Sequence, residues 1–169
     1  MKKKIFNKKL KKIFKGIWFY GLSGSGKTYI SKILYKKIKN SILVDGDNIR
    51  KLISTDLGYS KKDREVQIKR IFGICKIIIE SKKIPIASSV YFNKELNYLC
   101  KKIGIIPIFL ERNNFKKIIK KHKTYKNNKN VVGRDIFYSK FKKIKLVNDN
   151  TNKFFKNHKI FKKYQFKSN

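Results

Sequence analysis

An eight-residue, glycine-rich segment has the spacing of a phosphate-binding loop. It reads GLSGSGKT over residues 21–28 and directly follows an apolar run at residues 17–20. Glycines let the backbone wrap closely around phosphate, and the N-terminus of a following helix adds a favourable dipole. Lys27 can reach the β- and γ-phosphates of a nucleotide, and the Thr28 hydroxyl is placed for Mg²⁺. We therefore predict that ATP binds along the whole loop: Gly21, Leu22, Ser23, Gly24, Ser25, Gly26, Lys27 and Thr28.

A second polar segment, DGDNIR at residues 45–50, follows the next apolar run. Ligands of open parallel sheets bind at the carboxyl ends of the strands, so this segment is expected to face the phosphate loop. Asp47 can accept a proton from an attacking hydroxyl or hold a magnesium-bound water, and Arg50 can fork onto an anionic acceptor. A plain Asp-Gly turn with a capping aspartate is the structural alternative. Beside a phosphate loop we favour Asp47 as a catalytic residue and, with Thr28, as a metal-binding one.

The apolar periodicity predicts strands and helices that alternate along the chain. Strands are expected at residues 17–20, 42–44, 84–90, 105–110 and 145–147, and helices at residues 27–39, 49–53, 60–81, 93–102, 115–122 and 153–164. This alternation implies a parallel sheet that helices cover on both faces. We therefore predict an α/β protein with the three-layer P-loop NTPase fold. One domain would span residues 16–150 and include a mobile polar loop at 123–135, with a basic extension at 1–15 and a basic helix or tail at 151–169.

The 169-residue chain carries a formal net charge of +35, spread over its whole length. Lysine, isoleucine and asparagine share A/T-rich codons, so an AT-rich genome explains this bias without a partner. A nucleic-acid-binding protein with a vestigial nucleotide site is the alternative, and it predicts tight, salt-sensitive RNA binding. No apolar run approaches the roughly 18 residues of a transmembrane helix, and residues 1–15 lack the features of a signal peptide. We expect a soluble, cytoplasmic protein without a membrane or specific nucleic-acid partner.

The cysteines and histidines do not have the spacing of a metal site. Cys75 and Cys100 lie far apart in the sequence and belong to no CxxC or Cys/His pattern. They are expected to be reduced, buried thiols. His122 and His158 stand alone in lysine-rich segments and are expected at the surface rather than as ligands or bases.

Three motifs taken together resemble the adenylylsulfate (APS) kinase family. They are GLSGSGKT, then VDGDNIR at residues 44–50, then DLGYSKKDR at residues 56–64 followed by Ile68 and Arg70. The resemblance runs from about residue 16 to 150 and is more specific in the first half. That family transfers the γ-phosphate of ATP to the 3′-hydroxyl of adenosine 5′-phosphosulfate (APS) with Mg²⁺, giving PAPS and ADP in sulfate assimilation. The resemblance implies the same activity, ATP and Mg²⁺ as cofactors and APS as the substrate, and it suggests a homodimer.

The resemblance also implies roles for individual residues. Asp47 would be the catalytic carboxylate, Arg50 and Arg64 would grip the phosphosulfate, and Tyr59 would replace an adenine-stacking phenylalanine. Stacking survives this change because the ring face makes the contact. The implied catalytic residues are Lys27, Asp47 and Ser89. The implied substrate-binding residues are Asp47, Arg50, Tyr59, Arg64, Gln67, Ser88, Ser89, Lys129 and Val131.

Several positions depart from the family pattern. Residues 63–70 read DREVQIKR where members usually read DRxENIRR, so Gln67 replaces a substrate-contacting asparagine. Residues 88–92 read SSVYF in place of ISPYR, which keeps Ser89, the position phosphorylated in some members. A serine at a strand end can also serve only as a hydrogen-bonding residue. Residues 129–135 read KNVVGRD where the lid motif is KNFTGID, so Val131 replaces the second aromatic of the adenine clamp.

The loss of that ring would cost about 1–3 kcal/mol of base stacking. This keeps a second function open alongside APS kinase activity. The alternative is a P-loop kinase of the same build that acts on another nucleotide-linked or small phosphorylated acceptor.

Overall fold

The computed structural model describes residues 15–112, 115–141 and 145–148. The predicted basic extension, apart from Lys15, the terminal helix at 153–164 with its tail, and His158 lie outside the described residues. Within them the chain forms one five-stranded sheet in the order β2-β3-β1-β4-β5. Every pair of neighbouring strands is parallel. Strand β1, which leads into the phosphate loop, therefore lies at the centre of the sheet.

Strands and helices alternate along the chain, as the sequence predicts. The strands are β1 (Gly16–Tyr20), β2 (Ser41–Asp45), β3 (Ile84–Ser89), β4 (Ile105–Arg112) and β5 (Lys145–Asn148). The helices are α1 (Lys27–Lys37), α2 (Gly46–Leu52), α3 (Lys61–Glu80), α4 (Lys94–Lys102), α5 (Phe115–Lys121) and α6 (Lys123–Asn127).

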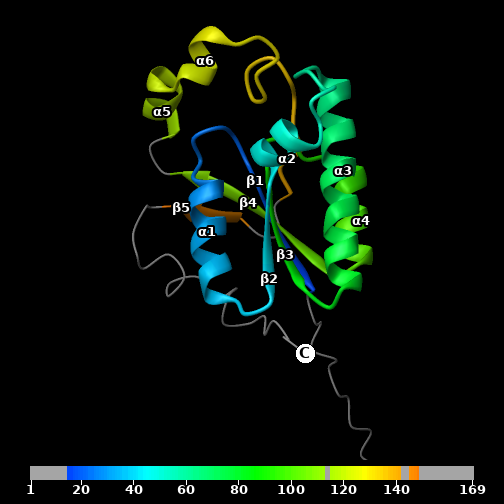
Figure 1. Ribbon diagram of the computed structural model, residues 1–169. Coiled ribbons are helices and arrows are strands. Elements are labelled where there is room, and N and C mark those ends of the chain that lie inside the picture. The colour runs from blue at the N-terminus through cyan, green and yellow to red at the C-terminus, as the bar shows by residue number, and fades with distance from the viewer. Residues whose placement is uncertain (1–14, 113–114, 142–144, 149–169) are drawn as a thin grey trace, which may run out of the picture.

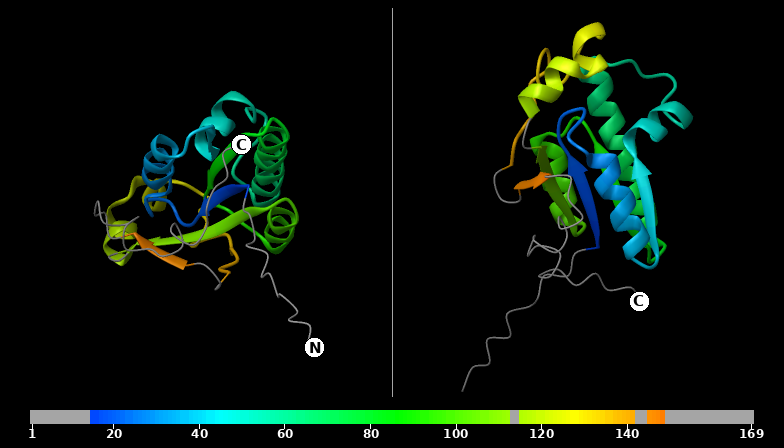
Figure 2. Two further views of the ribbon diagram at one scale, coloured as in Figure 1. Left: turned by 90° about the horizontal axis from the view of Figure 1, so that it is seen from below. Right: turned by 90° about the vertical axis from the view of Figure 1, so that its left-hand side faces the viewer.

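Successive residues of β1 point to opposite faces of the sheet and so enter two different cores. Trp18 and Tyr20 pack in the larger core, while Ile17 and Phe19 pack in the smaller one. Helices α3 and α4 cover the larger core, and α1 covers the other face (Figures 1 and 2). These three layers confirm the predicted fold class.

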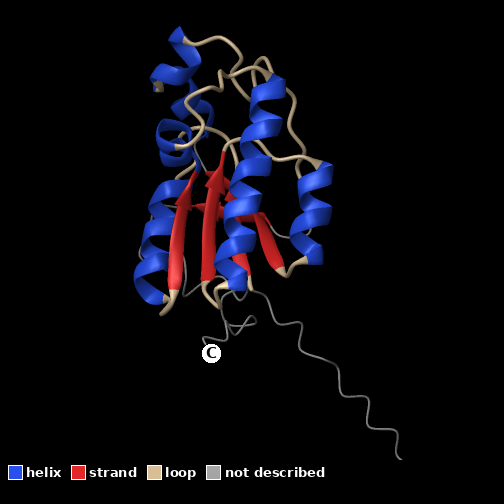
Figure 3. Cartoon of the chain, turned by 45° about the vertical axis from the view of Figure 1, so that its right-hand side comes forward, coloured by secondary structure: helices blue, strands red, loops and turns tan. Residues whose placement is uncertain are grey.

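The strand ends that carry the polar motifs all lie at one end of the sheet. The strands point toward α5, α6 and the loop that follows them, as Figure 3 shows. Because the strands are parallel, the residues just after β1, β2 and β3 come together at this edge. The fold thus brings residues 21–28, 45–50 and 88–92 to one place.

Two elements differ from the sequence-based expectation. Helix α2 begins at Gly46, before the predicted residue 49, because the Asp45 side chain accepts hydrogen bonds from the amides of Asp47 and Asn48 and caps the helix. The loop predicted at 123–135 contains the short helix α6, which His122 caps by accepting from the Thr124 amide.

None of the helices in the described ranges is long and apolar enough to cross a membrane.

Candidate active site

The phosphate loop joins the buried strand β1 to helix α1. Its glycines are needed for backbone reasons at two positions. A Cβ atom at Gly21 would lie 2.4 Å from the Leu110 carbonyl oxygen of the neighbouring strand. Gly26 has φ of 92° and caps α1 from a left-handed conformation that side chains disfavour. The loop is therefore fixed closely against the sheet, with the start of α1 directly behind it.

Lys27, the lysine of the loop, is buried and folds back onto the loop itself. Its Nζ donates a hydrogen bond of 2.9 Å to the Leu22 carbonyl oxygen. Burial lowers the pKa of Lys27 to about 8, although the nearby carboxylates of Asp47 and Asp45 oppose this shift. An anionic ligand in the loop would stabilise the protonated form of this side chain.

Asp45, the last residue of β2, accepts a hydrogen bond from the predicted metal-binding hydroxyl. Thr28 Oγ1 donates a 2.8 Å hydrogen bond to Asp45 Oδ2, and Ser88 Oγ donates to the same oxygen at 3.0 Å. The other oxygen, Oδ1, accepts from the Asp47 amide at 3.0 Å. The predicted metal-binding residues were Thr28 and Asp47, and Asp45 was not among them. Its position at the end of a strand opposite the phosphate loop was the signal that could have found it.

Asp47 lies in the first turn of α2 with an exposed side chain. It faces the cavity described below, where a hydroxyl of a bound acceptor could approach it. Its exposure contrasts with the burial of Asp45, which is 7% exposed. The two carboxylates of the DGD segment therefore have different surroundings and different possible roles.

Tyr59 carries two guanidinium groups against its ring. The Arg50 Cζ atom lies 4.8 Å from the ring centroid, and the Arg64 Cζ atom lies at 5.5 Å. Arg50 also donates to the carbonyl oxygens of Leu57 at 3.3 Å and Gly58 at 2.6 Å, which fixes the loop that presents Tyr59. These three side chains form one cationic and aromatic cluster.

Arg64 connects this cluster to the segment after α6. Its Nε donates to the Tyr59 carbonyl at 3.1 Å, and its Nη2 donates to the Asn130 carbonyl at 2.9 Å. Partial burial and the positive charge of Arg50 lower the pKa of Arg64. An anionic ligand at this point would relieve the repulsion between the guanidinium groups of Arg50 and Arg64.

Gln67 is buried on the inner face of α3, and its side-chain amide is only half satisfied. Nε2 donates to the Gly46 carbonyl at 3.1 Å, whereas Oε1 has no hydrogen-bond partner among the described residues. The side chain lines the cavity, so this oxygen is available to a donor group on a ligand.

The hydroxyl of Ser89 is already used in two hydrogen bonds within the protein. It accepts from Trp18 Nε1 at 2.8 Å and donates to the Tyr91 carbonyl at 2.8 Å. These contacts fit the hydrogen-bonding alternative for this serine. The catalytic role of Ser89 stays a prediction.

One cavity of about 920 Å³ contains almost all the predicted site residues. From the phosphate loop it is lined by Ser23, Gly24, Gly26, Lys27 and Thr28. All of the predicted substrate-binding residues also line it, namely Asp47, Arg50, Tyr59, Arg64, Gln67, Ser88, Ser89, Lys129 and Val131. Gly21, Leu22 and Ser25 are not in its wall. The phosphate-binding and acceptor-binding motifs therefore open into a single space.

The segment at residues 122–135, which we call the lid segment, forms the roof of this cavity. His122 and Thr124 line the cavity, although His122 was expected only at the surface. Arg134 holds the segment together by donating to the carbonyl oxygens of Tyr125 at 2.6 Å and Asn128 at 2.5 Å. Gly133, with φ of 88°, lies so close to Leu22 that a Cβ atom there would be 2.6 Å from Leu22 Cδ2. The lid segment thus packs directly on the phosphate loop.

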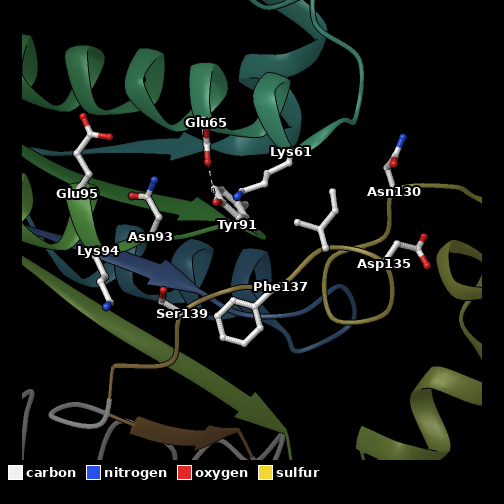
Figure 4. Close-up of a pocket in the computed structure, with 11 residues that line it drawn as sticks. Lys61, Glu65, Tyr91, Asn93, Lys94, Glu95, Asn130, Asp135, Phe137 and Ser139 are labelled. Atoms are coloured by element: carbon white, nitrogen blue, oxygen red, sulfur yellow. Dashed lines mark hydrogen bonds between the residues drawn. The ribbon is translucent and has the colours of Figure 1, made fainter.

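A second cavity, of about 590 Å³, lies between the start of α3, the start of α4 and residues 135–139 (Figure 4). It shares Tyr91 and Asn130 with the first cavity. The Tyr91 hydroxyl donates to Glu65 Oε1 at 3.2 Å. In the part of the chain that the structure describes, no polar side-chain atom of this cavity is buried without a partner.

A protein-family model decides which family this arrangement belongs to. The model described as adenylylsulphate kinase matches residues 15–123, well over half of the chain. The chain belongs to the adenylylsulphate kinase family. The match includes the phosphate loop, the DGDNIR segment and the Tyr59 cluster, but it ends before Lys129 and Val131 of the lid segment.

Curated relatives and solved structures agree with this assignment. The chain is 39% identical over 103 residues to an adenylyl-sulfate kinase of Buchnera aphidicola, covering 56% of this chain and 49% of the relative. It is also 39% identical over 99 residues to that of Bacteroides fragilis, again covering 56% and 49%. The matched part therefore spans about half the length of these curated relatives.

Among solved structures, the Mycobacterium tuberculosis APS kinase CysC in complex with AMPPNP and APS has a similar fold. Its TM-score is 0.67 at 24% identity, and the superposition covers 82% of this chain and 91% of that one. At this identity the likeness shows the fold alone.

Proposed function

We propose that this chain is an adenylylsulfate kinase, which transfers the γ-phosphate of ATP to the 3′-hydroxyl of adenosine 5′-phosphosulfate and yields PAPS and ADP. The observation that carries the proposal is the single cavity that joins Lys27 and Thr28 to Asp47, Arg50 and Arg64. A donor site alone would explain the first two residues. The second group supplies a carboxylate and two guanidinium groups for an anionic acceptor.

On the donor side, the loop amides and Lys27 would hold the phosphates of ATP. Lys27 would exchange its bond to the Leu22 carbonyl for a phosphate oxygen, which favours its protonated form. This reorganisation is small because the side chain already lies in the loop.

The residues around Thr28 fit a magnesium ion bound together with the nucleotide. Thr28 and Asp45 offer hard oxygen donors 2.8 Å apart, the ligand type that Mg²⁺ prefers. The described residues contain no cluster of three His, Cys, Asp or Glu side chains that would hold a metal alone. Such a site suits an ion that is completed by phosphate oxygens and water. When bound, Mg²⁺ would neutralise charge on the phosphates.

On the acceptor side, Asp47 is proposed as the group that takes the proton. The acceptor hydroxyl oxygen forms a bond to the γ-phosphorus, the bond from that phosphorus to the β–γ bridging oxygen breaks, and the proton passes to the Asp47 carboxylate. Asp47 is suited to this because its side chain is exposed to the cavity. Asp45 is less suited because it is buried and its oxygens already accept hydrogen bonds.

Arg50 and Arg64 are proposed to bind the phosphosulfate, and Tyr59 to stack on the adenine. Gln67 Oε1 is a free acceptor for a donor group of the same nucleotide. Val131, which is 2% exposed, offers an apolar wall in place of a second aromatic ring. This leaves base stacking to Tyr59.

The direct test incubates purified protein with ATP, Mg²⁺ and APS and follows the formation of PAPS and ADP. Turnover should require APS and should fall to background in the Asp47→Ala variant. Turnover no higher than that of the variant would contradict the proposal. A panel of other nucleotide-linked and small phosphorylated acceptors, followed by ADP release, tests the alternative acceptor, which exclusive use of APS would reject. The homodimer stays a prediction that light scattering can check.

A further inference from the structure

Three successive carbonyl groups of the phosphate loop accept hydrogen bonds from side chains. Lys27 Nζ donates to Leu22, the Tyr125 hydroxyl donates to Ser23 at 3.1 Å, and Arg112 Nη1 donates to Gly24 at 3.4 Å. The bond from Lys27 is available only until a phosphate competes for the ammonium group. The other two donors, Tyr125 and Arg112, are not among the residues that line the cavity.

The bond from Tyr125 bears on the direction of one amide group. In a planar trans peptide the C=O of one residue and the N–H of the next point in nearly opposite directions. A donor bonded to the Ser23 carbonyl therefore fixes the Gly24 N–H in the nearly opposite direction. Ser23 and Gly24 both line the cavity. The Tyr125 hydroxyl thus fixes the orientation of a loop amide that belongs to the cavity wall.

Tyr125 is itself held in place by two sets of contacts. Its side chain is 7% exposed, and its own carbonyl oxygen accepts from Arg134 Nη1 at 2.6 Å. Asp135 Oδ1 in turn accepts from Arg134 Nε at 2.7 Å. A few residues along, Gly133 packs on Leu22 of the phosphate loop. These contacts hold the Tyr125 hydroxyl against the phosphate loop.

We propose that Tyr125 is a positioning residue for the phosphate loop, which acts through the Ser23 carbonyl and not by touching the nucleotide. The inference rests on the proposed function, because it takes the loop as the binding site for the phosphates of ATP. The lid segment then positions the phosphate loop, which binds the donor, in addition to covering the acceptor.

The test removes only the hydroxyl, in a Tyr125→Phe variant. Loss of one neutral hydrogen bond should weaken ADP binding and raise the KM for ATP by about 3- to 10-fold. The KM for the acceptor should stay within about twofold, because the aromatic ring and its packing are retained. Titration calorimetry with ADP and initial rates against each substrate measure these quantities. If the role of Tyr125 were purely structural, the variant would have a lower melting temperature, and the KM for ATP would not change more than the KM for the acceptor.

Tyr98→Phe is the matched control, because Tyr98 is 65% exposed on α4 and lines neither cavity. It should leave ADP affinity unchanged. Arg134→Gln provides an independent variant, since it cuts the bonds that hold the Tyr125 backbone and should also weaken ADP binding. Arg134 is exposed, so this change spares the core.

Equal ADP affinity in Tyr125→Phe and the unaltered protein would overturn the inference. So would an equal rise in the KM values for donor and acceptor. These outcomes differ from failure of the proposed function: a protein that binds ADP but does not use APS would reject the acceptor, while the ADP titrations still decide the role of Tyr125. An unaltered protein that binds no ADP would reject both.

Discussion

Thr28 and Asp45 form one hydrogen-bonded unit, with the hydroxyl of the phosphate loop 2.8 Å from a carboxylate oxygen at the end of β2. Asp45 also holds the amide of Asp47 and so sets the start of α2. One buried side chain thereby links the proposed metal site to the backbone that carries the proposed base. The roles of Asp45 and Asp47 can be distinguished by experiment because only Asp45 is buried.

The same substitution at the two aspartates should have different effects on stability. Asp45→Asn replaces a buried acceptor of several hydrogen bonds and should cost about 1–3 kcal/mol of unfolding free energy. Asp47→Asn should leave the denaturation midpoint unchanged and lower kcat by about 100-fold or more, through loss of the base. Chemical denaturation and initial rates measure both. A normal kcat in Asp47→Asn would remove this residue from the mechanism.

Nucleotide affinity should fall above pH 8 because burial lowers the pKa of Lys27 to about 8. Below that pH the lysine is protonated with and without ligand. Above it the free protein loses the proton, whereas bound phosphate favours the charged form, so binding must take up a proton. The Kd for ADP should rise about tenfold between pH 7.5 and pH 9. A Lys27→Met variant should bind more weakly at both values, and an unchanged ratio in that variant would assign the effect to another group.

Ser89→Ala should reduce stability more than turnover. The change leaves the buried indole N–H of Trp18 without its acceptor, which costs about 1–3 kcal/mol. Trp18 is the sole tryptophan, so its fluorescence reports the change directly. Ser81→Ala is the control, because that hydroxyl bonds to Ile77 at an exposed helix end. A tenfold loss of kcat in fully folded Ser89→Ala would instead support the catalytic role.

The two thiols should be unreactive in the native protein. Cys75 and Cys100 are free and fully buried, and burial raises the pKa of each thiol. Ellman's reagent at pH 8 should therefore label neither at an appreciable rate, whereas denatured protein should release two equivalents. Rapid labelling of the folded protein would show that the packing between α3 and α4 opens readily.

The sequence predicted those parts of the site that depend on one strand and the loop after it. The phosphate loop and DGDNIR follow apolar strands, and a parallel sheet brings all such segments to one edge, so their meeting could be expected. Asp45 could have been named as a candidate from its place at the strand end, but the sequence does not show which of Asp45 and Asp47 turns inward. The contact from Tyr125 to Ser23 also had no sequence signal, since it joins residues 102 positions apart.

The lid segment shows a similar limit. Its polar composition predicts a loop, and five residues of it form α6 because His122 caps the first turn and tertiary contacts hold Tyr125. Local propensity is a weak guide where a segment packs on a distant loop. The buried thiols, by contrast, were predicted correctly, because Cys75 and Cys100 belong to no metal-binding or disulfide pattern and such cysteines are usually buried.

The central place of β1 in the sheet has a consequence for biosynthesis. Trp18 pairs in register with Ala87 on one side and Pro107 on the other, so β1 is synthesised well before either of its neighbouring strands. Until β3 and β4 have been synthesised, the β1 residues have no sheet to enter, and long-range pairing of this kind is slow. The nascent chain thus exposes the apolar residues of β1 until these later strands have been made, which makes β1 a natural target for chaperones.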